Sequence, residues 1–229
     1  MTGTAFSLTL NGTQVLALAS GAVLVPSADL LCVADLHLGK SERAARRRGA
    51  LLPPYETRAT LDRLAEVIAV ARPRVVVALG DSFDDLAAGA ALDGEDRDRL
   101  GLLAQGRRWI WVAGNHDPGA AGHGGETVEE FRAEGLTFRH EAAPGAAPGE
   151  VSGHYHPKLA LPGAGGARPC FLHDDRRLIL PAFGAYTGGL DARDPALRGL
   201  LGPHALAVLT GARAVPAPLP PARAAARRG

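Results

Sequence analysis

Aspartate, asparagine and histidine side chains recur in five short polar blocks, each directly after an apolar run. The blocks are Asp35-Leu36-His37, Gly80-Asp81, Gly114-Asn115-His116-Asp117, His140 and Gly153-His154-Tyr155-His156. Carboxylate and imidazole groups together suit borderline divalent ions such as manganese, iron or zinc. By itself, a Gly-Asp pair is more typical of a helix N-cap or a turn, and a His-x-His pair on a strand could be two ordinary residues on one face. Five such blocks in succession instead predict a metal centre.

The blocks follow segments that have the pattern of buried β-strands. The runs LLCVA, PRVVVAL and RRWIWVA are almost continuously apolar, which is typical of parallel strands covered on both faces. Helices are predicted between them at 55–71 and 94–105, so the first half is predicted as β-α-β-α-β. Ligands bind beyond the carboxyl ends of the strands in such sheets, and we expect the blocks to meet at that edge.

The remaining elements are shorter. Asn11-Gly12 between alternating apolar runs predicts a β-hairpin. Short helices are expected at 41–48 and 126–134, and short strands separated by Gly, Pro and Ala turns fill the second half. We expect one domain over residues 1–215 and a frayed Pro/Arg-rich tail over 216–229.

The charges are balanced overall and uneven locally. The chain has 25 basic and 24 acidic residues, which excludes a globally basic nucleic-acid binder. Residues 40–48 carry five basic and one acidic side chain, whereas residues 81–99 carry seven acidic and two basic ones. Lys40 and Arg43 could hold substrate phosphates after the first block, and a solvated helix face is an equal alternative.

The cysteines and the hydropathy of the chain indicate the cellular compartment of the protein. Cys32 and Cys170 lie in apolar runs and are interpreted as small buried side chains in a reducing environment. No apolar stretch is long enough to span a membrane and the N-terminus lacks the charged start of a signal peptide. We therefore expect a cytoplasmic protein.

The order and placement of the five blocks resemble the calcineurin-like metallophosphoesterases, over residues 34–157. The segments ALGDSF, WIWVAGNHDP, GHYHP and LPAFGAYTGGLD look like the DNA-ligase-associated metallophosphoesterases, over almost the whole chain. The resemblance implies an α/β fold, a four-layer αββα sandwich of two mixed β-sheets flanked by helices. One departure lies at Asp85, where the wider superfamily often has arginine in a GDxxDR motif.

The resemblance also implies a role for each polar block. It assigns one divalent ion to Asp35, His37 and His156, a second to Asn115, His140 and His154, and a bridging position to Asp81. A pair of ions about 3.5–4 Å apart lowers the pKa of a shared water, so the expected nucleophile is a metal-bridging hydroxide. Manganese is expected, with iron or zinc possible. His140 could also be a plain surface histidine.

His116 is expected to stand outside the metal ligands. It would donate a proton to the leaving oxygen or stabilise charge on the phosphoryl group, and Asp117 could orient its ring. The turn Tyr186-Thr187-Gly188-Gly189 could lie beside the pocket, and a plain turn is as consistent with the sequence. Trp109 and Trp111 are expected in the core.

The leading hypothesis is a dinuclear-metal phosphodiesterase that cuts DNA as an endonuclease in repair. The hydrolase chemistry rests on the residues, and the DNA substrate rests on the resemblance. The same resemblance implies a DNA ligase, a helicase and an exonuclease-like protein as partners. Two alternatives are a hydrolase of small phosphodiesters such as cyclic nucleotides and a catalytically silent protein-binding scaffold. The complete ligand set and His116 argue against the scaffold.

Overall fold

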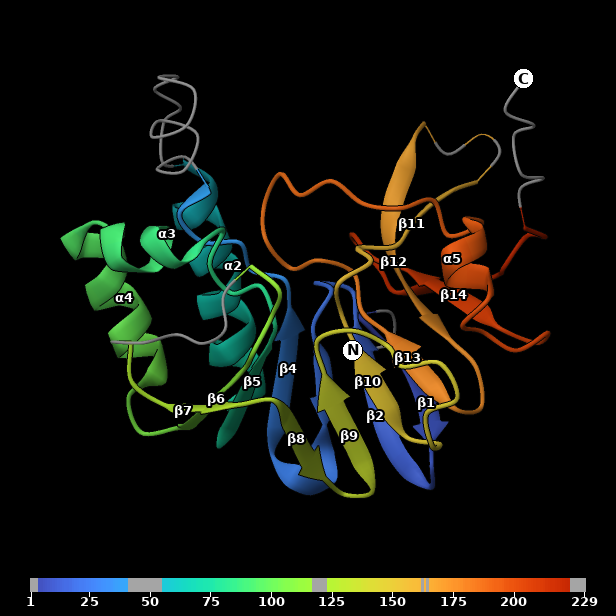
Figure 1. Ribbon diagram of the computed structural model, residues 1–229, viewed down its shortest axis with the longest axis horizontal. Helices are drawn as coiled ribbons and strands as arrows, with labels where there is room; N and C mark the ends of the chain where they lie inside the picture. Colours follow the sequence, from blue (N-terminus) through green and yellow to red (C-terminus); the bar gives the residue numbers. More distant parts are fainter. Residues whose placement is uncertain (1–3, 41–54, 117–122, 162, 164, 223–229) are drawn as a thin grey trace.

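The three apolar runs form the centre of a seven-stranded sheet (Figure 1). In spatial order its strands are β1 (Ala5–Leu10), β2 (Thr13–Leu18), β3 (Val23–Val25), β4 (Leu30–Ala34), β5 (Val75–Leu79), β6 (Arg108–Val112) and β7 (Glu126–Val128). Strands β4 to β7 are parallel, and β1 to β4 are joined antiparallel. The computed structural model describes residues 4–40, 55–116, 123–161, 163 and 165–222, so the helix expected at 41–48 lies outside the described residues.

The second sheet is also mixed. Its strands in spatial order are β15 (Val215–Pro218), β14 (Leu206–Leu209), β12 (Ala167–His173), β13 (Arg177–Ile179), β10 (Glu150–Ser152), β9 (Leu136–Arg139) and β8 (Glu130–Ala133), and β11 (Lys158–Ala160) pairs with β12. The pairs β9–β10 and β10–β13 are parallel, and the other pairs are antiparallel.

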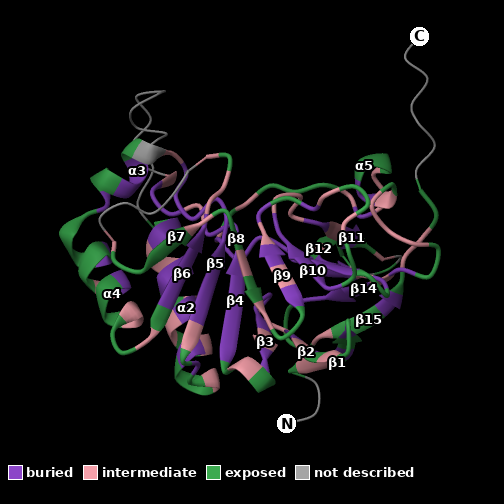
Figure 2. Cartoon of the chain, turned by 60° about the horizontal axis from the view of Figure 1, so that its bottom comes forward, coloured by how far each residue is buried: buried purple, intermediate pink, exposed green. Residues whose placement is uncertain are grey.

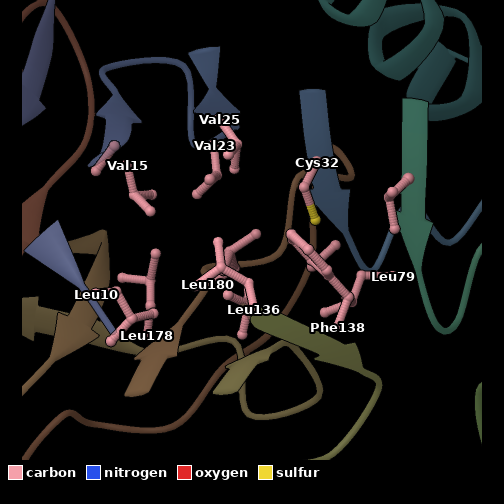
Figure 3. Close-up of a cluster of buried hydrophobic side chains, with 14 of the residues drawn as sticks. Leu10, Val15, Val23, Val25, Cys32, Leu79, Leu136, Phe138, Leu178 and Leu180 are labelled. Carbon is pink, nitrogen blue, oxygen red and sulfur yellow. The ribbon is translucent and has the colours of Figure 1, made fainter. Parts of the chain in front are cut away.

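Side chains that alternate along each central strand separate the layers of the sandwich. In β4, Leu30, Cys32 and Ala34 face the interior between the sheets, whereas Leu31 and Val33 face the helices. Figure 3 shows this interior, with Cys32 and Leu79 of the first sheet opposite Phe138 and Leu136 of the second. This period-2 pattern is what strands buried on both faces require.

Helices cover the two outer faces unequally (Figures 1 and 2). Within the described ranges, the helices are α2 (Tyr55–Ala71), α3 (Leu86–Ala91), α4 (Gly94–Ala104), α5 (Pro195–Arg198) and one 3₁₀ turn (Pro26–Ala28). α2 and α4 contribute to an apolar cluster on the outer face of the first sheet. A third cluster, which includes Leu197 of α5, covers the second sheet. The predicted αββα sandwich of two mixed sheets is confirmed, with a thin second outer layer.

Two expectations about local structure are wrong. The segment 126–134, expected as a helix, forms β7 of the first sheet and β8 of the second. Its glutamates favour a helix. The strand pairing and the packing of Val128, Phe131 and Ala133 against the central core instead stabilise two strands. The tail expected to fray from residue 216 begins inside β15, an edge strand that tolerates its prolines. The boundary between the domain and the tail at 215/216 stays a prediction.

Other local expectations agree with the structure. The Asn11-Gly12 turn joins β1 to β2 with both residues at positive φ, as a type I′ hairpin needs. Cys32 and Cys170 are buried free thiols, and burial raises the pKa of Cys170 to about 12. Among the described residues, no helix combines the length and the apolar character needed to cross a bilayer.

The interior between the sheets predicts a large effect of one substitution. Phe138→Ala, at a fully buried position of β9, is expected to lower the free energy of unfolding by about 3–5 kcal/mol because it leaves a cavity. Leu102→Ala on the exposed face of α4 should change it by less than about 0.5 kcal/mol. Chemical denaturation followed by circular dichroism measures both, and similar values for the two variants would contradict the assignment of the core.

Candidate active site

The described residues of all five polar blocks meet at the carboxyl ends of strands from both sheets. Asp35 follows β4 and Gly80-Asp81 follows β5. His140 and Gly153-His154 directly follow β9 and β10, whose arrowheads point to the same edge as that of β4 in Figure 1. The site therefore combines loops of two sheets, and the sandwich fixes their relative positions.

The first cluster consists of Asp35, His37 and His156. The Nε2 atoms of His37 and His156 lie 3.4 Å apart, and His156 Nε2 lies 3.5 Å from Asp35 Oδ1. One donor atom from each residue lies within 4.8 Å of the other two. All three side chains are buried or nearly so.

The second cluster consists of Asp81, His140 and His154, with Asn115 beside it. His140 Nε2 lies 2.7 Å from Asn115 Oδ1, 3.1 Å from His154 Nδ1 and 3.5 Å from Asp81 Oδ2. His140 also adjoins the first cluster, because its Nδ1 lies 3.7 Å from Asp35 Oδ1. Burial lowers the pKa of His140, which favours the neutral imidazole that a metal ion binds.

These distances fit divalent cations. Ligand bonds of about 2.0–2.2 Å put neighbouring donors roughly 3.0–3.5 Å apart, close to the separations in both clusters. Asp35 Oδ1 is buried and has no hydrogen-bond donor among the described residues. A buried carboxylate oxygen next to imidazole nitrogens is costly unless a cation or a proton compensates it. The donor set therefore suits a metal ion in each cluster.

Each buried aspartate is held by one carboxylate oxygen and offers the other to the clusters. Asp35 Oδ2 accepts the backbone N–H of His154 at 2.9 Å, and Asp81 Oδ1 accepts that of His116 at 2.9 Å. The remaining oxygens, Asp35 Oδ1 and Asp81 Oδ2, face histidine nitrogens. The two hydrogen bonds tie the first block to the fifth and the second to the third.

The backbone turns sharply at most of these residues. Five of the seven predicted ligands have positive φ, namely Asp35 (+53°), His37 (+47°), Asp81 (+39°), His154 (+71°) and His156 (+47°). Such angles are uncommon outside glycine and cost about 1–3 kcal/mol each. Strain of this kind gathers at sites where the fold imposes a geometry for binding or catalysis.

Glycines precede three of the predicted ligands because no side chain fits there. A Cβ on Gly80 would lie 1.9 Å from His140 Nδ1, and one on Gly114 would lie 2.3 Å from Asp81 Oδ1. A Cβ on Gly153 would lie 2.6 Å from Asp35 Oδ2. The glycines of the Gly-Asp, Gly-Asn and Gly-His pairs are therefore required by the close approach between the blocks.

Asp84 positions two histidines and was not singled out as a site residue by the sequence. Its Oδ1 lies 3.2 Å from His37 Nδ1, an arrangement that orients the other ring nitrogen toward a metal. Its carbonyl oxygen lies 3.2 Å from His116 Nδ1. The signal was present in the GDxxD spacing. Asp85, where arginine is common in the superfamily, instead caps α3 by accepting from the Ala88 backbone N–H at 2.7 Å.

Of the remaining predicted site residues, the structure describes His116 and Lys40. His116 lies at the site with its side chain about one-third exposed, and its ring contacts that of His37 at a centroid distance of 5.7 Å. Lys40 Nζ donates to the carbonyl of Tyr186 at 3.0 Å, so part of its hydrogen-bonding capacity holds a loop. Arg43 and Asp117 lie outside the described residues, and their roles stay predictions.

A two-sheet sandwich with these clusters at its strand ends is suited to metal-dependent phosphoester hydrolysis. The chain belongs to the calcineurin-like phosphoesterase family, whose model matches residues 28–178. The structure is similar to that of nuclease MPE from Pseudomonas putida, with a TM-score of 0.74, 26% identity and coverage of 93% of this chain and 100% of that one. It is also similar to Yfce, a phosphoesterase from E. coli, with a TM-score of 0.40, 17% identity and coverage of 70% and 83%. A search of curated proteins gives no match.

These findings confirm the predicted family and the predicted class of enzyme. The chain is a metal-dependent phosphoesterase and hence a hydrolase. The similarity to a nuclease is consistent with the DNA-ligase-associated branch that its sequence resembles. Both clusters are candidate metal sites in a fold that implies divalent ions.

The close approach at Gly80 predicts a loss of metal binding. Gly80→Ala places a methyl group against the His140 ring at a φ of +66°, and we expect manganese affinity to fall at least about 10–100-fold. Gly101→Ala in α4 is the matched control, since no atom lies within 4 Å of its added Cβ. Calorimetric titration of metal-stripped protein measures the affinity. Wild-type affinity in a folded Gly80→Ala protein would contradict the described packing.

Proposed function

We propose that this protein is a dinuclear-metal-dependent nuclease that hydrolyses DNA phosphodiester bonds as an endonuclease in DNA repair. The observation that carries the proposal is the adjacency of the two clusters, joined through His140 and the two buried aspartates. Similarity to a protein named as a nuclease supports a nucleic-acid substrate. The resemblance to DNA-ligase-associated metallophosphoesterases supports the role in repair.

In this proposal seven side chains would hold two divalent cations, with manganese as the expected ion. Asp35, His37 and His156 would hold one, Asn115, His140 and His154 would hold the other, and Asp81 would be shared between them. Two bound cations would neutralise charge on phosphoryl oxygens and make water a better nucleophile at neutral pH. Asp84 acts on this set by orienting His37.

His116 is proposed to donate a proton to the leaving oxygen. Its Nδ1–H donates to the Asp84 carbonyl in the tautomer that this contact selects, which leaves Nε2 directed to the site. Nε2 lies 4.0 Å from Asp81 Oδ2, so a proton carried on Nε2 lies beside the second cluster, where the leaving oxygen of a bound phosphoester would be. The exposure of His116 leaves room for substrate, and Asp117 is proposed to help orient it.

The proposed surroundings of the site follow from charge and resemblance. Lys40 and Arg43 are proposed to contact phosphates that flank the scissile bond. A DNA ligase, a helicase and an exonuclease-like protein are the proposed partners, and the cytoplasm is the proposed location. A net charge of +1 means that DNA binding depends on local contacts around the cations rather than on the field of the whole chain.

The first test removes the bridging carboxylate. Asp81→Ala is expected to reduce manganese-dependent cleavage of plasmid and single-stranded DNA by at least about a thousandfold, because the cations lose a shared ligand. Asp175→Ala, an exposed aspartate in the turn after β12, serves as the matched control. Hydrolysis of cyclic nucleotides without any cut in DNA would instead favour the small-phosphodiester alternative. A purified wild-type protein that binds no metal would favour the scaffold.

The second test separates proton donation from metal binding. His116→Ala is expected to lower kcat for DNA cleavage by about 10²–10⁴-fold while the metal content, measured by plasma mass spectrometry, stays near that of the wild type. The control is His204→Ala, because His204 is an exposed histidine just before β14. A parallel loss of metal and rate in His116→Ala would show a ligand rather than a proton donor.

A further inference from the structure

The two ring nitrogens of His154 have different surroundings. Nδ1 lies 3.1 Å from His140 Nε2 and so faces the second cluster. Nε2, on the other side of the ring, lies 3.9 Å from Oε1 of Glu141. A neutral histidine that binds a metal through one nitrogen carries its proton on the other, and that N–H commonly donates to a carboxylate or a carbonyl. Glu141 is a carboxylate on the side of that proton.

Glu141 reaches this position because β9 and β10 are parallel neighbours (Figure 1). Directly after these strands, the backbone N–H of Gly153 donates to the carbonyl of His140 at 2.9 Å. The same register continued by one residue puts Glu141 opposite His154. Neighbouring strands lie about 4.8 Å apart, so a glutamate side chain at this position is long enough to reach the imidazole ring.

Tyr155 keeps the carboxylate of Glu141 close to this ring. Its hydroxyl donates to the same Oε1 at 3.2 Å, and its own ring lies edge-on to that of His154 at a centroid distance of 5.0 Å. The tyrosine is itself fixed, because it packs against the apolar cluster on the outer face of the second sheet. Its carbonyl also accepts the backbone N–H of Leu190 at 3.2 Å. A fixed donor thus limits the conformations of an exposed glutamate.

The backbone that follows Glu141 is held by a buried ion pair. Glu150 Oε1 and Arg177 Nη1 lie 3.2 Å apart, and the two side chains are only 2% and 5% exposed. Glu150 Oε2 accepts the backbone N–H of Ala143 at 3.0 Å, and Arg177 Nη2 donates to the carbonyl of the same residue at 3.3 Å. The segment that carries His140 and Glu141 therefore has a fixed end at Ala143.

We propose that Glu141 is a positioning residue of the second metal site, where it accepts the Nε2–H of His154 and is held in place by the hydroxyl of Tyr155. The inference rests on the proposed binding of an ion by Asn115, His140 and His154. The distance of 3.9 Å is longer than a hydrogen bond, and a shift of about 1 Å closes it. The Glu141 side chain is 59% exposed, so this shift displaces no packed group.

The contact has a counterpart on the first cluster. Asp84 Oδ1 lies 3.2 Å from His37 Nδ1, while His37 Nε2 faces the first cluster. Each cluster then has one histidine whose outer nitrogen faces a carboxylate. The Asp84 side chain is 7% exposed and that of Glu141 is 59% exposed. Because solvent weakens the interaction of exposed charges, we expect Glu141 to have the smaller effect on metal affinity.

The test measures manganese binding rather than cleavage. Metal-stripped wild type, Glu141→Ala, Glu141→Gln, Tyr155→Phe and the double variant Glu141→Ala/Tyr155→Phe are titrated with Mn²⁺ by calorimetry. Electron paramagnetic resonance of the loaded proteins distinguishes a coupled pair of ions from isolated ions. Glu129→Ala, at an exposed glutamate between β7 and β8, is the matched control, and Asp84→Ala is the reference for the first site. Circular dichroism checks the folding of every variant.

The expected result is a selective loss of one ion. Glu141→Ala should weaken one of the two ions about tenfold, at the lower end of the roughly 10–100-fold range for such contacts, and leave the other unchanged. Glu141→Gln should recover part of this loss, because its amide oxygen still accepts the N–H of the ring. Tyr155→Phe should weaken the same ion about two- to tenfold, with no further effect in the double variant, because it acts through Glu141. Asp84→Ala should weaken the other ion.

Other outcomes overturn the proposal in distinguishable ways. Wild-type affinity for both ions in Glu141→Ala would remove the positioning role and leave the dinuclear centre intact. Equal weakening of both ions in that variant would show a general structural role for the segment. A Glu141→Gln protein no better than Glu141→Ala would show an effect of charge alone, without a hydrogen bond to His154. A wild type that binds a single ion, with no coupled signal, would overturn the proposed dinuclear centre itself.

Discussion

Two carboxylates buried at the end of the first sheet are the constraint on which the rest of the site depends. Asp35 is fully buried and Asp81 nearly so, and an uncompensated charge in such a place would be strongly destabilising. The chain compensates each in part with one backbone N–H from a later block. The other oxygen of each faces imidazole nitrogens, where a divalent cation would complete the balance. Metal binding would then be coupled to the stability of this edge.

This arrangement explains why the site needs both sheets and tight turns. The N–H that binds Asp35 belongs to His154, which follows a strand of the second sheet. The approach leaves no space for side chains at Gly80, Gly114 and Gly153, and five of the seven predicted ligands adopt left-handed backbone. The apolar interior between the sheets supplies the packing energy that offsets this strain.

The sequence predicted the parts of this structure that depend on local pattern. Continuous apolar runs identified β4, β5 and β6, and the polar residues after them identified the edge where the blocks meet. The segment 126–134 was predicted wrongly because its pairing partners lie in two different sheets, and no local pattern contains that information. Asp84 lies at the second aspartate of the GDxxD spacing, but that spacing does not say which side chain it contacts. Its contact with His37 spans 47 positions of sequence and depends on the parallel pairing of the two loops.

The acidic segment 81–99 shows how the fold changes the meaning of a charge pattern. As sequence, its seven acidic residues suggest a surface that repels nucleic acid. In the structure Asp81 faces the second cluster, Asp84 orients His37, and Asp85 and Asp93 cap α3 and α4. Asp96 is buried against Arg58 and so adds little to the outer field. Much of the negative charge of this segment is therefore engaged in contacts within the protein.

With a net charge of +1, the chain has no large electrostatic field to attract a phosphate backbone. In the proposed function, affinity for a nucleic acid would then come from cations held at the strand ends and from uncharged contacts beside them.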